Sequence, residues 1–173
     1  SAQLKSAVIL AGLNSFGTTS ITEEKKSRDH TENMLENNIQ ALKIKKGKTK
    51  YIDIFGKQYL KPIDIDVPGD PSAAAFYVAL TLLNKNSTLN IKNVGLNPTR
   101  IGFYELLKKH GAKISFKNKK KKNNELIGDI KVKSGALKKP IIASKDFYEK
   151  TTDEFPILFC IAALTEGISI FRG

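Results

Sequence analysis

Three stretches of the chain share one pattern of apolar and polar positions. Each begins with an alanine-rich apolar segment typical of a buried helix, followed by a short turn and a run of small and β-branched residues typical of a strand. The stretches are residues 1–23, 70–94 and 153–171. Their starts lie roughly 70 to 80 residues apart, which indicates a repeated supersecondary unit larger than a solenoid repeat.

Local residues set the expected boundaries within each stretch. Ser1 is suited to cap the first helix and Gly12 to end it, with a strand at residues 18–22. Pro71 and Pro156 fall in the first turns of the second and third helices, where proline is tolerated because those N–H groups have no intrahelical acceptor. The other expected elements of these stretches are helices at residues 73–83 and 157–164, strands at residues 87–94 and 168–171, and a helix stop at Gly167.

The segments between these stretches continue the alternation. Ser27 or Asp29 is suited to cap an amphipathic helix that carries Met34, Leu35 and Ile39. The other expected elements are a helix at residues 101–110, capped by Asn97 or Thr99 and ended by Gly111, and strands at residues 42–46, 51–55, 63–67, 112–116, 127–132 and 140–143.

One segment interrupts this alternation as a domain crossing would. Residues 67–70, Val-Pro-Gly-Asp, combine a proline and a glycine after an expected strand and before an expected helix. We therefore divide the chain into residues 1–66 and residues 67–173. The mixture of helices and strands in both parts predicts the α/β class.

Composition narrows the class of protein. With 173 residues, 40% of them hydrophobic, the chain can bury a core, which argues against disorder throughout. Its most apolar run, residues 157–164, is far shorter than the roughly 20 residues of a membrane-spanning helix. Cys160 is the sole cysteine, so we expect no internal disulfide or cysteine zinc site, and Cys160 itself to be a buried small hydrophobe. Because the sequence opens on Ser1 without a basic leader, we expect an internal part of a longer protein rather than a signal peptide.

The formal net charge of +12 comes almost entirely from lysine, since Arg28, Arg100 and Arg172 are the only arginines. Proteins that read bases favour the planar arginine fork, so this distribution argues against sequence-specific binding to nucleic acid. We expect the lysines of residues 45–50 and 117–122 to lie in solvated turns and to attract small anions. A basic, non-catalytic nucleic-acid-binding module is the alternative from another class, and salt-sensitive binding to any duplex would identify it.

Five local strings go beyond these patterns because they follow one another in a fixed order. They are Ser-Ala-Gln-Leu-Lys-Ser-Ala at residues 1–7, Leu-Ala-Gly-Leu-Asn at residues 10–14, Ser-Arg-Asp-His-Thr-Glu at residues 27–32, Val-Pro-Gly-Asp-Pro-Ser at residues 67–72 and Val-Gly-Leu-Asn-Pro-Thr-Arg at residues 94–100. Each alone is turn or capping chemistry. Together they resemble the 5-enolpyruvylshikimate-3-phosphate (EPSP) synthases, the enolpyruvyl transferases of the shikimate pathway, over the whole chain.

The resemblance implies a two-domain α/β enzyme built as an inside-out α/β barrel of repeated βαβαββ units, with helices inside and sheets outside. Residues 1–66 would form the C-terminal part of the first domain, and residues 67–173 the N-terminal part of the second. The implied reaction moves the enolpyruvyl group of phosphoenolpyruvate to the 5-hydroxyl of shikimate 3-phosphate and releases phosphate, with no metal or organic cofactor.

The resemblance also sets expectations about partners and location. The parent is expected to be cytoplasmic and monomeric, to use these two small-molecule substrates, and to bind neither nucleic acid nor membrane. The related enolpyruvyl transferase that acts on UDP-N-acetylglucosamine is the nearest alternative. The string at residues 27–32 argues against it, because it fits a small phosphorylated ring better than a nucleotide sugar.

Candidate substrate-binding residues follow from the same resemblance. Ser1, Ala2 and Gln3 match the tripeptide that receives shikimate 3-phosphate, and Gln3 also lies toward phosphoenolpyruvate. A hydroxyl and exposed N–H groups at a helix N-terminus suit an anion, because the helix dipole is positive there. The alternative is that Ser1 only caps the helix. Since Ala2 stands where other members have serine, its contact must come from the backbone.

Ser27 and Arg28 match further contacts to the substrate phosphate, which a guanidinium can bind through two parallel hydrogen bonds. A surface arginine neutralised by Asp29 is the alternative for Arg28. His30 invites a general-base assignment, but we expect a structural or substrate-edge role, because some members carry an aromatic residue there.

Asp153 matches the family aspartate at the start of an inward-facing helix, which binds the ring hydroxyls and acts as base for the attacking 5-hydroxyl. A helix N-terminus favours the ionised carboxylate that a base requires. The alternative, which is compatible with catalysis, is that Asp153 caps this helix, and Glu154 is adjacent. We expect Arg100 to pair with a carboxylate or a helix end, and Asp70 to cap the helix that follows it.

Other residues that the family places at its active site do not occur in this sequence. They are an early lysine-bearing loop, an arginine that binds phosphoenolpyruvate, and an Arg-Val-Lys-Glu-type segment. Because such cations stabilise a phosphate-bearing intermediate, we expect these 173 residues alone to be inactive and the full-length parent to be the enzyme.

Overall fold

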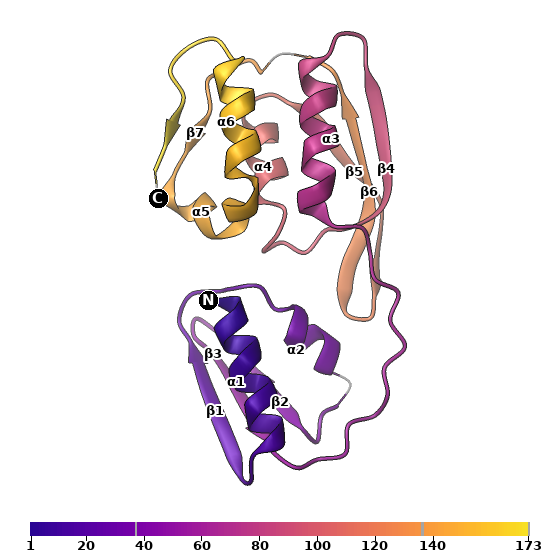
Figure 1. The fold of residues 1–173 in the computed structure, drawn as a ribbon, viewed down its shortest axis with the longest axis vertical. Coiled ribbons are helices and arrows are strands. Elements are labelled where there is room, and N and C mark those ends of the chain that lie inside the picture. Colours follow the sequence, from indigo (N-terminus) through magenta and orange to yellow (C-terminus); the bar gives the residue numbers. More distant parts are fainter. Residues whose placement is uncertain (37, 136, 173) are drawn as a thin grey trace. The chain divides into compact units, whose positions relative to one another are not determined.

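The chain forms two compact units in a computed structural model that describes residues 1–36, 38–135 and 137–172. Unit 1 is Ser1–Asp66 and unit 2 is Val67–Gly173. Figure 1 shows each unit as helices packed on strands. Within the described residues, no helix is both long enough and apolar enough to cross a membrane.

Unit 1 packs two helices against a three-stranded antiparallel sheet in which β3 is central. Side chains alternate between the faces of a strand, so Ile52 and Ile54 of β3 share one face and meet Ile9 of the first helix. Leu35 and Leu42 complete this small core. The elements are α1 (Ala2–Asn14), β1 (Thr18–Glu23), α2 (His30–Leu35), β2 (Leu42–Lys45) and β3 (Lys50–Phe55).

Unit 2 has a larger core between its helices and a second antiparallel sheet, in which β6 is central. Phe103, Leu106 and Leu107 of α4 and Leu158 of α6 are all fully buried in it. A short parallel pair, β7 with β8, follows the main sheet in the chain. The elements are α3 (Pro71–Leu83), β4 (Thr88–Gly95), α4 (Gly102–Lys109), β5 (Lys113–Lys122), β6 (Glu125–Lys133), β7 (Ile142–Ala143), α5 (Lys145–Thr151), the 3₁₀ turn η1 (Thr152–Glu154), α6 (Phe155–Ala163) and β8 (Ile170–Phe171).

The repetition read from the sequence is present in these elements. Residues 2–55 and residues 71–133 both run helix, strand, helix, strand, strand, and in both sheets the third strand lies between the other two. The predicted α/β class therefore agrees with the structure, whereas a complete barrel is not contained in these residues.

Asp129 of β6 holds two irregularities of the unit 2 sheet. The register of β4 shifts between Ile91 and Val94, and that of β5 shifts between Lys117 and Lys120. The Asp129 carboxylate accepts hydrogen bonds from the Asn93 amide at 3.1 Å and from Asn118 Nδ2 at 2.7 Å. Both asparagines have positive φ, which asparagine tolerates better than most residues.

Two boundary predictions for unit 1 are wrong. Gly12 does not end α1, because the helix continues to Asn14. A Cβ at Gly12 would lie 3.1 Å from Ile54 Cγ2 and from Thr19 Cβ, so the glycine serves the close approach of helix and sheet. The next helix, α2, ends at Leu35, which leaves the exposed Ile39 outside it.

The expected strand at residues 63–67 is also absent. These residues belong to no sheet in the structure, and the side chains of Ile63, Ile65 and Val67 are all exposed. Alternation of apolar residues predicts a strand only where a partner strand and a covering layer exist. The sequence pattern alone could not reveal that both are missing here.

Two predictions for unit 2 also need correction, and one helix was missed. Cys160 is exposed rather than buried, because α6 turns Leu158 and Ile161 toward the core. The short helix α5 was not predicted. The lysines of residues 117–122 are exposed as expected, but they lie in strand β5 rather than in a turn.

The expected cap of α4 is a separate turn. Its N-cap residue is Ile101, and the side-chain oxygen of Asn97 instead accepts from the Thr99 amide at 2.9 Å and from the Thr99 hydroxyl at 2.7 Å. This Asx turn precedes the helix.

Candidate functional site

The N-terminus of α1 has the geometry of an anion receptor. The Lys5 amide donates the first intrahelical hydrogen bond, to the Ser1 carbonyl at 3.1 Å, so the amides of Ala2, Gln3 and Leu4 point out of the helix end. The first turn carries no acidic residue that would compete for these donors. Ser1 is the N-cap residue, but its side chain makes no capping hydrogen bond. The Ser1 side chain is therefore not engaged in capping.

Ser27 lies between β1 and α2 and is fixed by Glu23. The Glu23 oxygen Oε1 accepts from the Ser27 hydroxyl at 2.5 Å and from the Ser27 amide at 3.1 Å. Ser27 therefore does not cap α2, whose N-cap residue is Asp29, again without a side-chain capping bond. Arg28 is half-buried between these two residues. The hydroxyl proton of Ser27 is directed at Glu23, so a phosphate would have to compete with that carboxylate for it.

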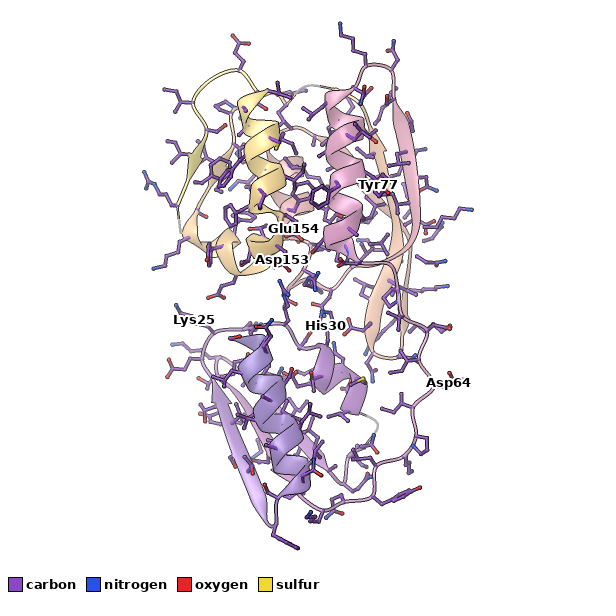
Figure 2. The ribbon with its side chains drawn as sticks, viewed as in Figure 1. Lys25, His30, Asp64, Tyr77, Asp153 and Glu154 are labelled. Carbon is purple, nitrogen blue, oxygen red and sulfur yellow. The ribbon has the colours of Figure 1, made fainter. Side chains whose placement is uncertain are left out.

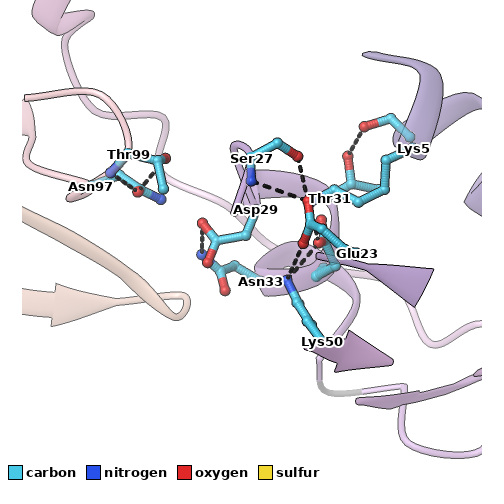
Figure 3. Close-up of polar contacts among 11 residues, drawn as sticks. Lys5, Glu23, Ser27, Asp29, Thr31, Asn33, Lys50, Asn97 and Thr99 are labelled. Carbon is cyan, nitrogen blue, oxygen red and sulfur yellow. Dashed lines mark hydrogen bonds and ion pairs between the residues drawn. The ribbon is translucent and has the colours of Figure 1, made fainter. Parts of the chain in front are cut away.

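Four charged side chains form a buried cluster, the unit 1 ion network, which consists of Lys5, Glu23, Glu32 and Lys50. Figure 3 labels three of them, Lys5, Glu23 and Lys50. Lys5 Nζ lies 2.9 Å from Glu23 Oε1 and 2.7 Å from Glu32 Oε1. Lys50 Nζ lies 2.8 Å from Glu32 Oε1 and 3.7 Å from Glu23 Oε2. Two positive charges balance two negative charges, so these lysines are already neutralised and an anion at the α1 N-terminus must find its counter-charge elsewhere.

The ion network also determines the ionisation of Glu23. Burial raises the pKa of Glu23, but hydrogen bonds from Ser27 and Lys5, together with the charge of Lys5, outweigh burial and hold the pKa below its ordinary value. Glu23 is therefore an acceptor at neutral pH. Through these contacts, Glu23 joins Lys5 in α1 to Ser27 in the connection between β1 and α2.

A second contact joins the same two regions. The hydroxyl oxygens of Ser6 in α1 and Thr31 in α2 lie 2.7 Å apart. Within unit 1, the structure therefore ties together the two segments that carry Ser1, Ala2 and Gln3 on one side and Ser27 and Arg28 on the other.

Asp153 lies in the middle of η1, directly before α6, and its side chain is exposed. The N-cap residue of α6 is Glu154, so the alternative in which Asp153 caps this helix is wrong. The carboxylates of Asp153 and Glu154 differ in burial: Glu154 is only 3% exposed. Figure 2 shows the two side chains next to each other at the start of α6.

The expectations for Asp70 and Arg100 are confirmed. The Asp70 carboxylate caps α3, accepting from the Ser72 amide at 3.1 Å and from the Ala73 amide at 3.2 Å. Arg100 Nη2 donates to Asp70 Oδ1 at 2.9 Å. Two of the five ordered strings therefore meet at the start of α3.

Sequence reasoning missed the unit 1 ion network entirely. Lys5 and Ile9 are four residues apart and both point inward, which is the one signal that could have marked this lysine as buried. A weaker signal marks Lys50 and Glu23: alternation puts Lys50 on the face of β3 that carries Ile52 and Ile54, and Glu23 on the face of β1 that carries Ile21. Among the described residues, no group of three or more His, Cys, Asp and Glu side chains is arranged to hold a metal ion.

Comparison with known proteins shows to which family this sequence belongs. The sequence profile of EPSP synthase, the 3-phosphoshikimate 1-carboxyvinyltransferase, matches residues 1–173. The chain belongs to the EPSP synthase family. It is 42% identical over 172 residues to the 3-phosphoshikimate 1-carboxyvinyltransferase of Bacillus licheniformis, which covers 99% of this chain and 39% of the relative. The enzyme of the same name from Zymomonas mobilis is 44% identical over 174 residues, covering 100% of this chain and 38% of the relative.

Solved structures agree with the sequence comparison. An EPSP synthase from Acinetobacter baumannii superposes with a TM-score of 0.85 at 39% identity, over 100% of this chain and 39% of that one. The 173-residue chain therefore spans about 39% of the length of such relatives. The family resemblance drawn from the five ordered strings is confirmed. The roles of individual residues stay predictions.

Proposed function

We propose that this chain is part of a 3-phosphoshikimate 1-carboxyvinyltransferase. In the proposed reaction, the 5-hydroxyl oxygen of shikimate 3-phosphate bonds to C2 of phosphoenolpyruvate, and its proton passes to a base. C3 of phosphoenolpyruvate gains a proton in this addition and loses one in the elimination, when the bond from C2 to the phosphate oxygen breaks and phosphate leaves. The observation that carries the proposal is the match to the EPSP synthase family along all 173 residues.

Unit 1 would bind the phosphate of shikimate 3-phosphate. The free-pointing amides at the start of α1 support a role for Ser1, Ala2 and Gln3, and Gln3 would also contact phosphoenolpyruvate. Ser27 and Arg28 would complete the phosphate contacts. Because the unit 1 ion network is neutral, Arg28 would supply the side-chain charge that the phosphate needs.

Unit 2 would supply the base. Asp153 is exposed on η1, directly before the N-terminus of α6. Its buried neighbour Glu154 is engaged inside the unit and is the poorer candidate. Addition and elimination need only proton transfers and stabilised charge, so the proposal includes no metal or organic cofactor.

We infer that units 1 and 2 are parts of two successive inside-out α/β barrels in a monomeric cytoplasmic enzyme. The apolar residues Phe76, Tyr77 and Leu80 of α3 are more than half exposed, and a helix that packs inside a complete barrel would have these side chains covered.

Turnover by the full-length protein tests this proposal. Purified full-length protein given phosphoenolpyruvate and shikimate 3-phosphate should release phosphate, and should not do so when UDP-N-acetylglucosamine replaces the shikimate substrate. The 173-residue chain alone should be inactive under both conditions. Turnover with the nucleotide sugar only, or salt-sensitive binding to duplex DNA without turnover, would replace the proposal with one of the two alternatives.

A further inference from the structure

Two ordered strings, Pro-Gly-Asp-Pro-Ser at residues 68–72 and Asn-Pro-Thr-Arg at residues 97–100, have no part in the proposed chemistry. In unit 2 their side chains form a continuous set of polar contacts, the unit 2 polar network, which consists of Asp70, Ser72, Arg100 and Glu154. Arg100 Nη2 donates to Asp70 Oδ1 at 2.9 Å and to Ser72 Oγ at 2.8 Å. The Ser72 hydroxyl donates in turn to Glu154 Oε1.

The Ser72 hydroxyl is fixed in both of its roles. The Arg100 guanidinium can only donate, so the Ser72 oxygen accepts from it. The Ser72 proton is then left to donate to the Glu154 carboxylate. Glu154 is 3% exposed, so solvent offers little replacement for this hydrogen bond. Glu154 is the last residue of η1 and directly follows Asp153. A fixed Glu154 side chain therefore restrains the backbone of the turn that carries Asp153.

Tyr104 strengthens the same region. Its hydroxyl donates to the Pro71 carbonyl at 2.5 Å, next to Ser72. Burial raises the pKa of Tyr104, the charges of Glu154 and Asp70 raise it further, and Arg100 opposes them, so the phenol remains a neutral donor over the physiological range.

Gly102, two residues after Arg100, constrains the other side of η1. A Cβ at Gly102 would lie 2.6 Å from Lys150 Cβ and 2.8 Å from Thr151 Cγ2, at the end of α5 and directly before η1. The start of α4 therefore packs closely against the residues that enter the turn. Arg100 contacts the other end of the turn through Ser72 and Glu154.

We propose that Ser72, Arg100 and Glu154 are positioning residues that hold the η1 turn, and with it Asp153, in one conformation. The proposal rests on the catalytic role of Asp153 proposed above. A displacement of about 1 Å in a reacting group can cost about 100-fold in rate, so a network that fixes this turn affects turnover without contacting substrate. In this proposal, the strings at residues 68–72 and 97–100 hold the candidate base in place.

The test compares two serine-to-alanine variants of the full-length protein. Ser72→Ala removes the hydroxyl that joins Arg100 to Glu154. Ser134→Ala is the matched control, because its half-buried hydroxyl accepts from the Ser87 amide at 3.0 Å in the same unit and has no bond to the unit 2 polar network. For each variant we would measure kcat, KM for shikimate 3-phosphate, and hydrogen exchange of the amides at residues 151–155. Ser72→Thr restores a hydroxyl.

Ser72→Ala is expected to lower kcat about tenfold or more, to change KM by much less, and to accelerate exchange at residues 151–155. Ser72→Thr should recover most of kcat, and Ser134→Ala should match the wild type in kcat and in exchange at these residues. Arg100→Lys keeps the positive charge but loses the planar pair of guanidinium donors, so it should also lower kcat. If Ser72→Ala does not fold, Arg100→Lys tests the proposal in its place.

Equal kcat and equal exchange in Ser72→Ala and Ser134→Ala would overturn the proposal, as would an equal loss in Ser72→Thr and Ser72→Ala. The failure of the proposed function looks different. In that case wild-type protein releases no phosphate, and the exchange at residues 151–155 still shows whether the network holds the turn.

Discussion

Glu32 of unit 1 and Glu154 of unit 2 are carboxylates with almost the same burial, at 1% and 3% exposed, in different surroundings. Glu32 lies within 2.8 Å of two lysine ammonium groups, those of Lys5 and Lys50. Glu154 accepts from the Ser72 hydroxyl, and the positive charge of Arg100 lies one hydrogen bond further away. In unit 1, direct ion pairs lie behind the candidate phosphate-binding residues. In unit 2, Glu154 beside the candidate base is connected to the charge of Arg100 only through the Ser72 hydroxyl.

The two cores explain why this difference matters. The unit 1 core is a small cluster around Ile9, Ile52 and Ile54, whereas the unit 2 core extends over several helices and its main sheet. A small core leaves unit 1 with less buried apolar surface to offset an unpaired charge. Burying charges is costly unless every charge is paired, so unit 1 should respond most strongly to the loss of one charge.

The largest expected effect is therefore in unit 1. Glu32→Gln should lower the free energy of opening of unit 1 by about 3–5 kcal/mol, because it leaves two buried ammonium groups facing one carboxylate. Hydrogen exchange of the β3 amides in the full-length protein measures this energy. Glu36→Gln, at an exposed position just after α2, is the control and should stay within about 0.5 kcal/mol of wild type. Equal effects of the two changes would mean that the ion network does not stabilise unit 1.

A smaller effect is expected at the helix cap of unit 2. Asp70→Ala should destabilise unit 2 by about 1 kcal/mol, since the Ser72 and Ala73 amides lose their acceptor. Asp70→Asn keeps an oxygen for the cap and loses only the ion pair to Arg100. Because Asp70 is 54% exposed, that loss should be below about 1 kcal/mol. Denaturant unfolding of both variants separates the contributions, and a larger loss in Asn than in Ala would contradict this assignment.

The smallest effect is a dependence of stability on acid. The pKa of Asp129 is lowered, first by the hydrogen bond from Asn118 and then by the Asn93 amide, and the pKa of Glu23 is lowered as described above. A carboxylate whose pKa is lower in the folded state binds fewer protons there than in the unfolded state. Both carboxylates should therefore contribute stability that is fully present above about pH 4.5 and is lost as the pH falls through their folded-state pKa values.

Variants identify the source of this dependence. Denaturant midpoints measured from pH 7 down to pH 3 should fall less steeply in Glu23→Gln and in Asp129→Asn than in the wild type. An unchanged slope in both variants would show that other carboxylates cause the acid sensitivity.

Comparison of sequence with structure shows which features local chemistry determines. The helices at residues 73–83 and 157–164, the Asp70 cap and the pairing of Arg100 were predictable, because each depends on residues close in sequence or on one strong electrostatic preference. The error at Gly12 has a tertiary cause. That glycine accommodates Thr19 and Ile54 against α1, and nothing in its own neighbourhood distinguishes such a role from a helix stop.

The candidate site was predictable to a similar extent. Ordered strings directed attention to Ser1, Ser27 and Arg28, but Ser27 was expected to bond to a helix end or a phosphate and instead donates to Glu23. The prediction that Cys160 is buried was wrong because the sequence of an all-apolar helix does not reveal which side faces the core. The pairing of residues that lie 18 positions apart, such as Lys5 and Glu23, leaves no periodic signal.

The most direct test of the proposed division of roles is steady-state phosphate release by the full-length protein carrying either Asp153→Asn or Arg28→Ala. If Asp153 is the base, Asp153→Asn should lower kcat by about 10²- to 10⁴-fold with a much smaller change in KM for shikimate 3-phosphate. Arg28→Ala should chiefly raise that KM and leave KM for phosphoenolpyruvate near the wild-type value. Unchanged kcat in Asp153→Asn, or a selective rise in KM for phosphoenolpyruvate in Arg28→Ala, would contradict the account.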